Sequence, residues 1–207
     1  MNNFPNNSDK LFQETLNPSG LLMQRSDNKF FLYSEGYKQA GQLIYEKIIA
    51  DEFYSMFLVY PMIFNFRQYI ELRLKELTIM GYKYLAEDCD FNDTHDLNAL
   101  FKKLRNDILN KINETDSVLL DNVQRLMHEF NKIDPGFSFR YPLTRSRPDG
   151  SRQPSLTMSN VDVQCFKASF DKLVSFLEHQ WDTLTNYQEL KDEHISEMMS
   201  QMYYFED

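Results

Sequence analysis

Three charged residues at helical spacing are the first candidates for chemistry in this sequence. Arg67, Glu71 and Lys75 follow one another at intervals of four residues, so they lie on one ridge of a helix. If this ridge faces a groove, Glu71 can orient the Arg67 guanidinium so that it holds a phosphate through two hydrogen bonds. If the ridge faces solvent, the same residues form a ladder of intrahelical ion pairs, each stabilising the helix by about 0.3–0.5 kcal/mol.

A histidine just before the next helical pattern is the second candidate. His95 precedes Asp96 and Leu97, and an imidazole there could act as a general acid or base because it changes charge near neutral pH. The alternative is a surface or capping residue. The other histidines are scattered over different segments: His128, His179 and His194. Because no histidine or cysteine has a second ligand at metal-binding spacing, we expect neither a metal site nor a cofactor.

A basic segment is the third candidate. Between residues 136 and 155 there are four arginines, namely Arg140, Arg145, Arg147 and Arg152. Only Asp149 opposes them, so the local charge is +3. Nearby aromatic residues, Phe137, Phe139 and Tyr141, could stack on bases, and the segment could contact the backbone of RNA or another phosphorylated ligand. The alternative is a solvated loop whose aromatic residues pack on the rest of the domain.

Composition indicates one globular domain. The chain has 207 residues, 42% of them hydrophobic, with a net charge of −9. Two cysteines cannot form a disulfide framework. The most apolar stretch, residues 57–66, contains Pro61 and is followed by Arg67, so no membrane span is expected. The polar residues after Met1 do not resemble a signal peptide. These features together predict a cytoplasmic protein.

Apolar periodicity predicts an all-α fold, a bundle of five main helices with a small β-hairpin between the fourth and fifth. The first helix is expected at about 34–50, with Ser34 as N-cap. The second segment begins at residue 51, is interrupted near Pro61 and continues as a long helix past residue 77. The other three helices are expected at 94–112, 117–133 and 161–187. The hairpin is expected at about 137–158, because residues 137–141 alternate and residues 147–150 suit a turn.

The two ends of the chain differ from its middle. Residues 1–28 are rich in Asn and Ser and are expected to form a poorly ordered arm. The helical domain is expected to span 29–190. Residues 191–207 form an acidic tail rich in Met and aromatic residues, which could include a short helix and could bind a protein partner.

Several short motifs, in this order, resemble a group of bacterial proteins of the HEPN superfamily. They cover roughly residues 34–180 and comprise Tyr60-Pro61, the run from Phe66 to Lys75, His95-Asp96-Leu97, Asp134-Pro135 and Phe139-Arg140-Tyr141-Pro142. The resemblance implies a helical bundle, a homodimer and a link to toxin–antitoxin or antiviral defence systems. It also implies RNA as the ligand, since many HEPN proteins are metal-independent ribonucleases.

The usual HEPN catalytic motif, Arg and then His four to six residues later on one helix, does not occur in this chain. Two functions therefore stay open, a ribonuclease and a catalytically inert helical subunit that dimerises and binds another protein. A ribonuclease would need Arg67, Glu71 and His95 to meet across two helices. Within one chain, antiparallel packing of these helices places His95 several turns from Arg67, so the pair is expected to meet across a dimer or through a bend.

Overall fold

The secondary structure of the described residues is predominantly helical, and the segment between the last two helices is irregular. The computed structural model describes residues 29–89, 93–112, 116–144 and 148–203, together with 8, 10–12 and 20–22. Its elements are α1 (Lys29–Ala50), the 3₁₀ turn η1 (Glu52–Tyr54), α2 (Ser55–Leu85), α3 (Leu97–Leu104), the π-helical η2 (Arg105–Leu109), α4 (Asn110–Ile112), α5 (Ser117–Ile133) and α6 (Val163–Tyr203). Because α3, η2 and α4 are continuous, these ranges form five helical segments, and the all-α prediction is confirmed.

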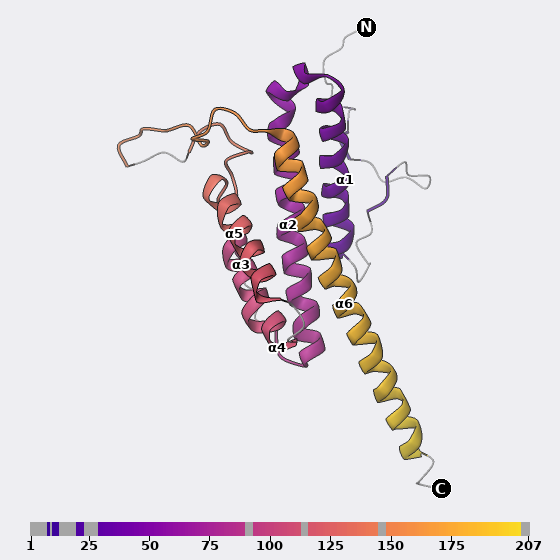
Figure 1. Cartoon of the computed structure of the whole chain (residues 1–207). Helices are drawn as coiled ribbons and strands as arrows, with labels where there is room; N and C mark the ends of the chain where they lie inside the picture. The colour runs from indigo at the N-terminus through magenta and orange to yellow at the C-terminus, as the bar shows by residue number, and fades with distance from the viewer. Residues whose placement is uncertain are drawn as a thin grey trace.

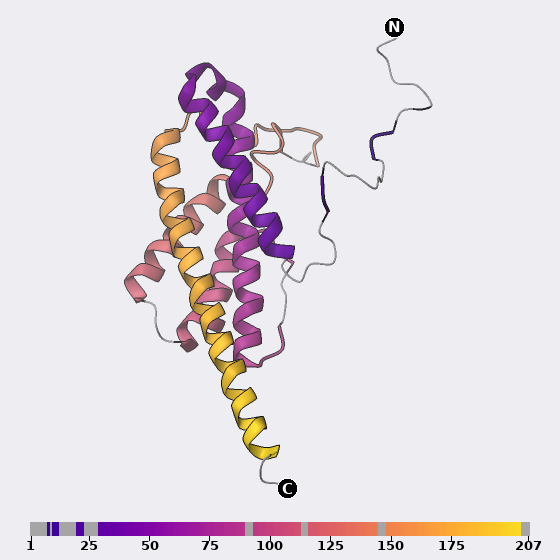
Figure 2. The same cartoon turned by 90° about the vertical axis from the view of Figure 1, so that its right-hand side faces the viewer.

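Helix α2 is the centre of the bundle. Helix α1 packs along it as an antiparallel neighbour, and α6 and α3 pack on its other sides. Helix α5 lies outside α3 and packs mainly on it. Figures 1 and 2 show that α6 crosses the whole body and projects beyond it. The segment between α5 and α6 lies at the end of the bundle opposite this projection.

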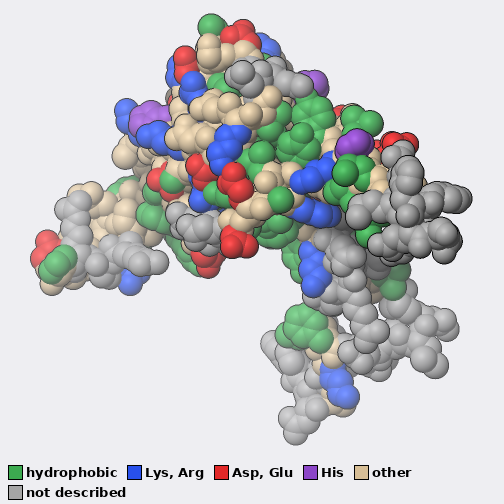
Figure 3. Space-filling model, turned by 90° about the horizontal axis from the view of Figure 1, so that it is seen from below, with side chains coloured by type: hydrophobic (Ala, Val, Ile, Leu, Met, Phe, Trp, Pro, Cys, Tyr) green, Lys and Arg blue, Asp and Glu red, His purple; other side chains and the backbone are tan. Residues whose placement is uncertain are grey.

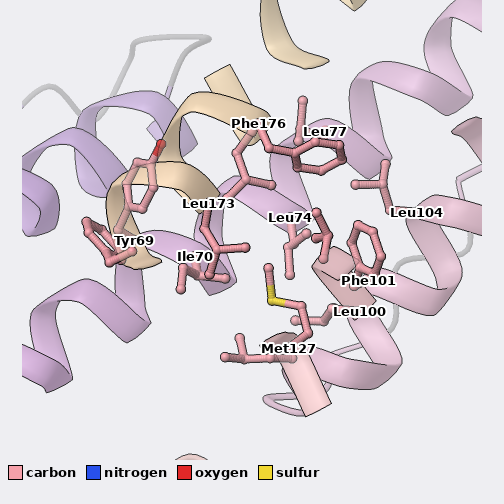
Figure 4. Packing of buried hydrophobic residues seen from close by; sticks show 14 of the residues in the cluster. Tyr69, Ile70, Leu74, Leu77, Leu100, Phe101, Leu104, Met127, Leu173 and Phe176 are labelled. Carbon is pink, nitrogen blue, oxygen red and sulfur yellow. The ribbon is translucent and has the colours of Figure 1, made fainter. Parts of the chain in front are cut away.

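The core follows the apolar pattern of α2. Its predicted stripe is buried throughout: Ile63, Phe66, Ile70, Leu74, Leu77 and Gly81. Figure 4 shows how α3, α5 and α6 contribute side chains around this stripe, among them Leu100, Phe101, Met127, Leu173 and Phe176. Burial of large apolar side chains, each stabilising by about 1.5–3 kcal/mol, is thus concentrated on one helix.

Helix boundaries depart from the predicted ones at three places. Ser34 is not an N-cap: α1 begins at Lys29, and the buried Ser34 hydroxyl donates to the carbonyl of Phe31. Helix α2 continues through Pro61, which lies near its exposed first turns, where water can replace the missing helical hydrogen bond.

Helix α6 is a single helix of 41 residues rather than a helix to residue 187 followed by a short terminal one. An unbroken run of helix-forming residues, without Gly or Pro, joins the two predicted parts. Despite its length, neither α6 nor any other described helix is long and apolar enough to cross a membrane.

The predicted β-hairpin is wrong. Residues 138–140 form a turn, with the amide groups of Arg140 and Tyr141 bonded to the carbonyl of Phe137, and no strand occurs in the described parts of 137–158. The chain does reverse, but it closes through a single antiparallel bridge between Leu143 and Pro154. The cause is Asp134, whose carboxylate accepts hydrogen bonds from the amides of Gly136 and Ser138 and curls the alternating segment.

A close approach between α1 and α2 generates a stability prediction. A Cβ atom on Gly41 would lie 2.4 Å from Cε1 of Phe66, a fully buried ring stacked 4.1 Å from the ring of Phe170. Because this ring has no room to move, we expect Gly41→Ala to lower the free energy of unfolding by about 1–3 kcal/mol. Urea denaturation followed by circular dichroism measures the change.

Gly36 on the same helix provides the matched control. A Cβ atom there would meet nothing within 4 Å. We expect Gly36→Ala to stabilise the protein by about 0.5–1 kcal/mol, since Ala favours a helix over Gly. Equal effects of the two substitutions would show that the contact with Phe66 does not limit the helix spacing.

Candidate active site

The carboxylate of Glu71 joins the charged residues predicted from the sequence. Its Oε2 atom lies 2.9 Å from Nη1 of Arg67, one turn earlier on α2. Its Oε1 atom lies 3.0 Å from Nζ of Lys75, one turn later. The same Oε1 atom lies 2.7 Å from Nδ1 of His95. The ridge on α2 therefore faces the segment that carries His95 and not solvent.

Arg67 is buried, with only 1% of its surface exposed, and its donors are directed at protein groups. Nη2 donates to the main-chain carbonyl of His95 at 2.5 Å. Nε donates to the carbonyl of Asp134 at 3.4 Å and forms an ion pair with the Oδ2 atom of that residue at 3.5 Å. Arg67 thus connects α2 with residues 95 and 134 and does not reach the surface.

Asp134 and Gly136 close the site from the end of α5. Asp134 is the C-cap of this helix, and its Oδ1 atom accepts from the amides of Gly136 at 2.9 Å and Ser138 at 2.7 Å. Gly136 has a φ angle of +121°, and a Cβ atom there would lie 3.3 Å from Cβ of His95 and 3.4 Å from Nη2 of Arg67. Only glycine fits this position without strain.

The segment before α3 holds His95 in place. Asp96 caps the helix, accepting from the amide of Ala99 at 2.8 Å. The hydroxyl of Thr94 accepts from the amide of Asp96, and the side chain of Asn131 on α5 accepts from the amide of Leu97. His95 therefore lies on backbone that is anchored on both sides.

Arg67, Glu71 and His95 come together within one chain, contrary to the expected separation. Helix α2 ends at Leu85, and its C-cap Ala86 has the left-handed conformation. The 14 residues from Glu71 to the last residue of α2 span about 21 Å of helix. The roughly ten residues after it can extend about 33 Å, enough to return beside α2. The expectation that His95 lies several turns from Arg67 assumed that His95 stays near the end of α2. It is wrong because the residues after α2 can return along the helix before α3 begins.

The imidazole of His95 is the exposed member of this group. About two thirds of its side-chain surface is accessible, against 3% for Glu71. Burial alone would raise the pKa of Glu71, but hydrogen bonds with Lys75 and His95, the charge of Lys75 and the hydrogen bond from Arg67 hold it below its ordinary value. An ionised carboxylate only accepts, so Nδ1–H of His95 donates to Glu71, and Nε2 is the ring nitrogen that does not contact this carboxylate.

A groove with a volume of about 690 Å³ begins at His95. Residues 135–137 and 140–144 line it together with Arg152. Arg140 donates to the carbonyl of Gly136, and its guanidinium lies 5.4 Å from the ring centre of Tyr141 and 5.8 Å from that of Phe64. Two of the four predicted arginines therefore line the same groove as His95. The other two, Arg145 and Arg147, lie outside the described residues.

Sequence reasoning missed Asp134 and Gly136 as parts of this site. Their signal was present, because Asp-Pro-Gly directly after an amphipathic helix indicates a tight turn with an Asp side chain free to bind backbone amides. Nothing in the spacing indicated that this turn would meet Arg67, 67 residues earlier. Within the described ranges, no three His, Cys, Asp or Glu side chains are arranged to hold a metal ion.

Comparison with known proteins gave no match: no protein-family model, no curated protein and no solved structure matches the chain. The resemblance to the HEPN superfamily therefore stays a prediction, as do the catalytic roles of Arg67, Glu71 and His95.

The charge of Glu71 leads to a prediction about stability and pH. Its pKa in the folded protein is lower than the ordinary value of 4.5, so its contribution to stability is complete above about pH 4.5 and is lost as the pH falls through the folded pKa. We expect Glu71→Gln to cost about 3 kcal/mol at pH 7, because Arg67 and Lys75 lose a buried partner. The difference from the wild type should shrink below pH 4.5.

Urea denaturation between pH 3.5 and 8 measures this difference. Glu129→Gln is the control, since Glu129 forms an exposed ion pair with Arg125, and such pairs contribute about 0–1 kcal/mol. A Glu71→Gln effect that does not vary with pH would contradict the ionised state of Glu71.

Proposed function

We propose that this protein is a HEPN-like, metal-independent endoribonuclease of a bacterial defence or toxin–antitoxin system, with His95 as the catalytic residue. The supporting observation is an exposed imidazole whose Nδ1 atom lies 2.7 Å from a buried carboxylate, at one end of a groove that also contains Arg140 and Arg152. A carboxylate that orients an imidazole in this way is the arrangement that general-base catalysis requires. The biological setting comes from the sequence resemblance.

Cleavage would proceed by attack of a ribose 2′-hydroxyl on the adjacent phosphate. As the 2′-oxygen bonds to phosphorus, its proton passes to Nε2 of His95, and Glu71 stabilises the imidazolium that forms. The bond from phosphorus to the 5′-oxygen then breaks, and the imidazolium returns a proton to the departing oxygen. Arg140 and Arg152 would stabilise the negative charge on the phosphoryl oxygens. The products are a 2′,3′-cyclic phosphate and a 5′-hydroxyl end.

Arg67 has a positioning role in this proposal. It is buried and bonded to Glu71, to the carbonyl of His95 and to Asp134, so contact with a phosphate would require it to leave these partners. The sequence suggested that Arg67 holds a phosphate. In this proposal the exposed Arg140 and Arg152 of the groove do so instead. Replacing Arg67 would leave buried Glu71 and Asp134 without a partner and would destabilise the fold as well as the site.

The arginines of the groove support the proposal of RNA binding despite the negative net charge of the protein. A protein of charge −9 repels phosphates on average. The segment between α5 and α6, which carries Arg140 and Arg152, lies at one end of the body, whereas the acidic end of α6 projects from the other. Acidic groups that lie farther from the groove than the Debye length of about 8 Å have little effect on it in physiological salt.

An inert interaction subunit is the second candidate function. The buried contacts of Arg67 favour it, because the network between α2, residue 95 and residue 134 would be sufficient reason for these charges even without catalysis. Exposed apolar residues at the turn between α1 and α2 also favour it: Ile49, Phe53, Met56, Phe57 and Tyr60. They could contribute to a homodimer interface, which the resemblance implies.

The replacement of His95 distinguishes the two functions. We expect His95→Gln to lower the rate of RNA cleavage by about 10²–10⁴-fold, the usual contribution of a general acid–base group, while the free energy of unfolding changes little because the imidazole is exposed. The assay follows total bacterial RNA and a labelled single-stranded oligoribonucleotide, with and without EDTA.

His128→Gln is the control, since His128 is an exposed residue of α5 outside the groove. Cleavage by the wild type that persists in EDTA and fails only in the His95 variant supports the proposal. If the wild type cleaves no RNA, or the two variants cleave equally, the inert subunit becomes the leading function.

RNA binding by the groove can be tested separately from cleavage. We expect Arg140→Gln and Arg152→Gln each to weaken binding of a non-cleavable 2′-deoxy oligonucleotide. Each lost phosphate contact should reduce the slope of log K against log salt by about 0.7, the value for single strands. Fluorescence anisotropy at 50–300 mM salt measures the slope, with Arg125→Gln on α5 as control. An unchanged slope in both groove variants would exclude the groove as the RNA site.

A further inference from the structure

The last turns of α6 carry an apolar face that no described element covers. Ile195, Met198 and Met199 are 46%, 53% and 53% exposed. Spacings of three and four residues place these side chains on one side of the helix. A solvated helix usually has polar side chains on its exposed face. Three large, exposed apolar side chains on one face of α6 therefore indicate an interaction surface.

This face continues the one by which α6 packs on α2. Tyr187 stacks on Tyr84 of α2, with 5.5 Å between the ring centres, and Nζ of Lys191 donates to the carbonyl of Tyr84 at 2.6 Å. Ile195 follows Lys191 by four residues and Met198 by seven, so they lie on the same side of α6. Helix α2 ends at Leu85. The apolar face therefore extends past the helix that covers its earlier part.

The uncovered part is long enough to bind another helix. Residues 192–203, which follow the contact of Lys191 with α2, extend about 18 Å at 1.5 Å per residue. Figures 1 and 2 both show this part of α6 away from the rest of the body. Figure 3, which looks at the end from which α6 projects, shows hydrophobic side chains gathered beside charged ones.

The negative charge at the end of α6 indicates which kind of helix can bind its apolar face. From residue 182 to the end of the chain there are seven acidic residues and one basic residue, Lys191, so the local charge is −6. Five of the acids are exposed residues of the described helix: Asp182, Glu189, Asp192, Glu193 and Glu197. A second copy of this helix would bring the same acids and be repelled, whereas a helix rich in Lys and Arg would be attracted.

We propose that the end of α6 from residue 191 onward binds a positively charged amphipathic helix of a different protein. Apolar side chains of that helix pack on Ile195, Met198 and Met199, and its Lys and Arg residues face the acids of α6. Methionine side chains suit this role because they adapt to differently shaped partners. This inference does not rest on the proposed ribonuclease function, since none of the residues of this surface lines the groove at His95.

Two labelled 18-residue peptides test the proposal with the intact protein. Both carry leucine at the same positions of one helical face, and the remaining positions are Lys in one peptide and Glu in the other. Fluorescence anisotropy in 150 mM salt measures binding. We expect the Lys peptide to bind and the Glu peptide to bind at least tenfold more weakly. The double substitution Met198→Ser and Met199→Ser should weaken binding of the Lys peptide at least tenfold, whereas Met198→Leu should retain it.

Leu43→Ser is the matched control, because Leu43 is 66% exposed but lies on α1; this variant should bind like the wild type. Circular dichroism verifies that each variant is folded. Equal binding of the Lys peptide by the wild type and the Met198–Met199 variant would overturn the proposal, as would equal binding of both peptides. A dimer in light scattering that this double variant converts to a monomer would also overturn it, since a second copy would then cover the face.

Discussion

The buried carboxylate of Glu71 is the interaction on which the structure of the site depends. An ionised carboxylate at 3% exposure would be strongly unfavourable alone, and Arg67 and Lys75 offset that cost from one turn on either side. Arg67 needs further acceptors for its remaining donors, and these are supplied by the carbonyl of His95 and by Asp134. Satisfying the charges of one helix therefore holds two loops, from distant parts of the sequence, against it.

In this arrangement the buried charged residues support the site, and different, exposed residues are available for chemistry. The charged groups closest to α2 are buried and paired, so they cannot readily move to a ligand, while His95 and Arg140 stand at the surface on backbone that the buried network holds. A preorganised site of this kind lowers the cost of orienting an acid–base group. The left-handed conformation of Gly136 and its close approach to His95 and Arg67 are part of the same constraint.

The two ends of the bundle carry opposite charge. Exposed arginines line the groove between residues 135 and 152, and acids surround the projecting end of α6. Helix α6 links these ends because it crosses the body on α2 and then continues beyond Leu85. The net charge of −9 therefore describes neither surface. The groove attracts negatively charged ligands, and the end of α6 attracts positively charged ones.

The sequence by itself determined the helical class, the buried stripe of α2 and the candidate residues Arg67, Glu71 and His95, since apolar periodicity and four-residue spacing are local properties. It could not place His95 beside Glu71, because the direction of the loop after Ala86 depends on what that loop packs against. It also suggested strand alternation at residues 137–141, where the Asp134 carboxylate instead curls the backbone. Only the tertiary structure decided that the Asp134 turn, the His95 segment and α2 meet at one point, because buried charges are satisfied by whichever partners the whole fold brings within reach.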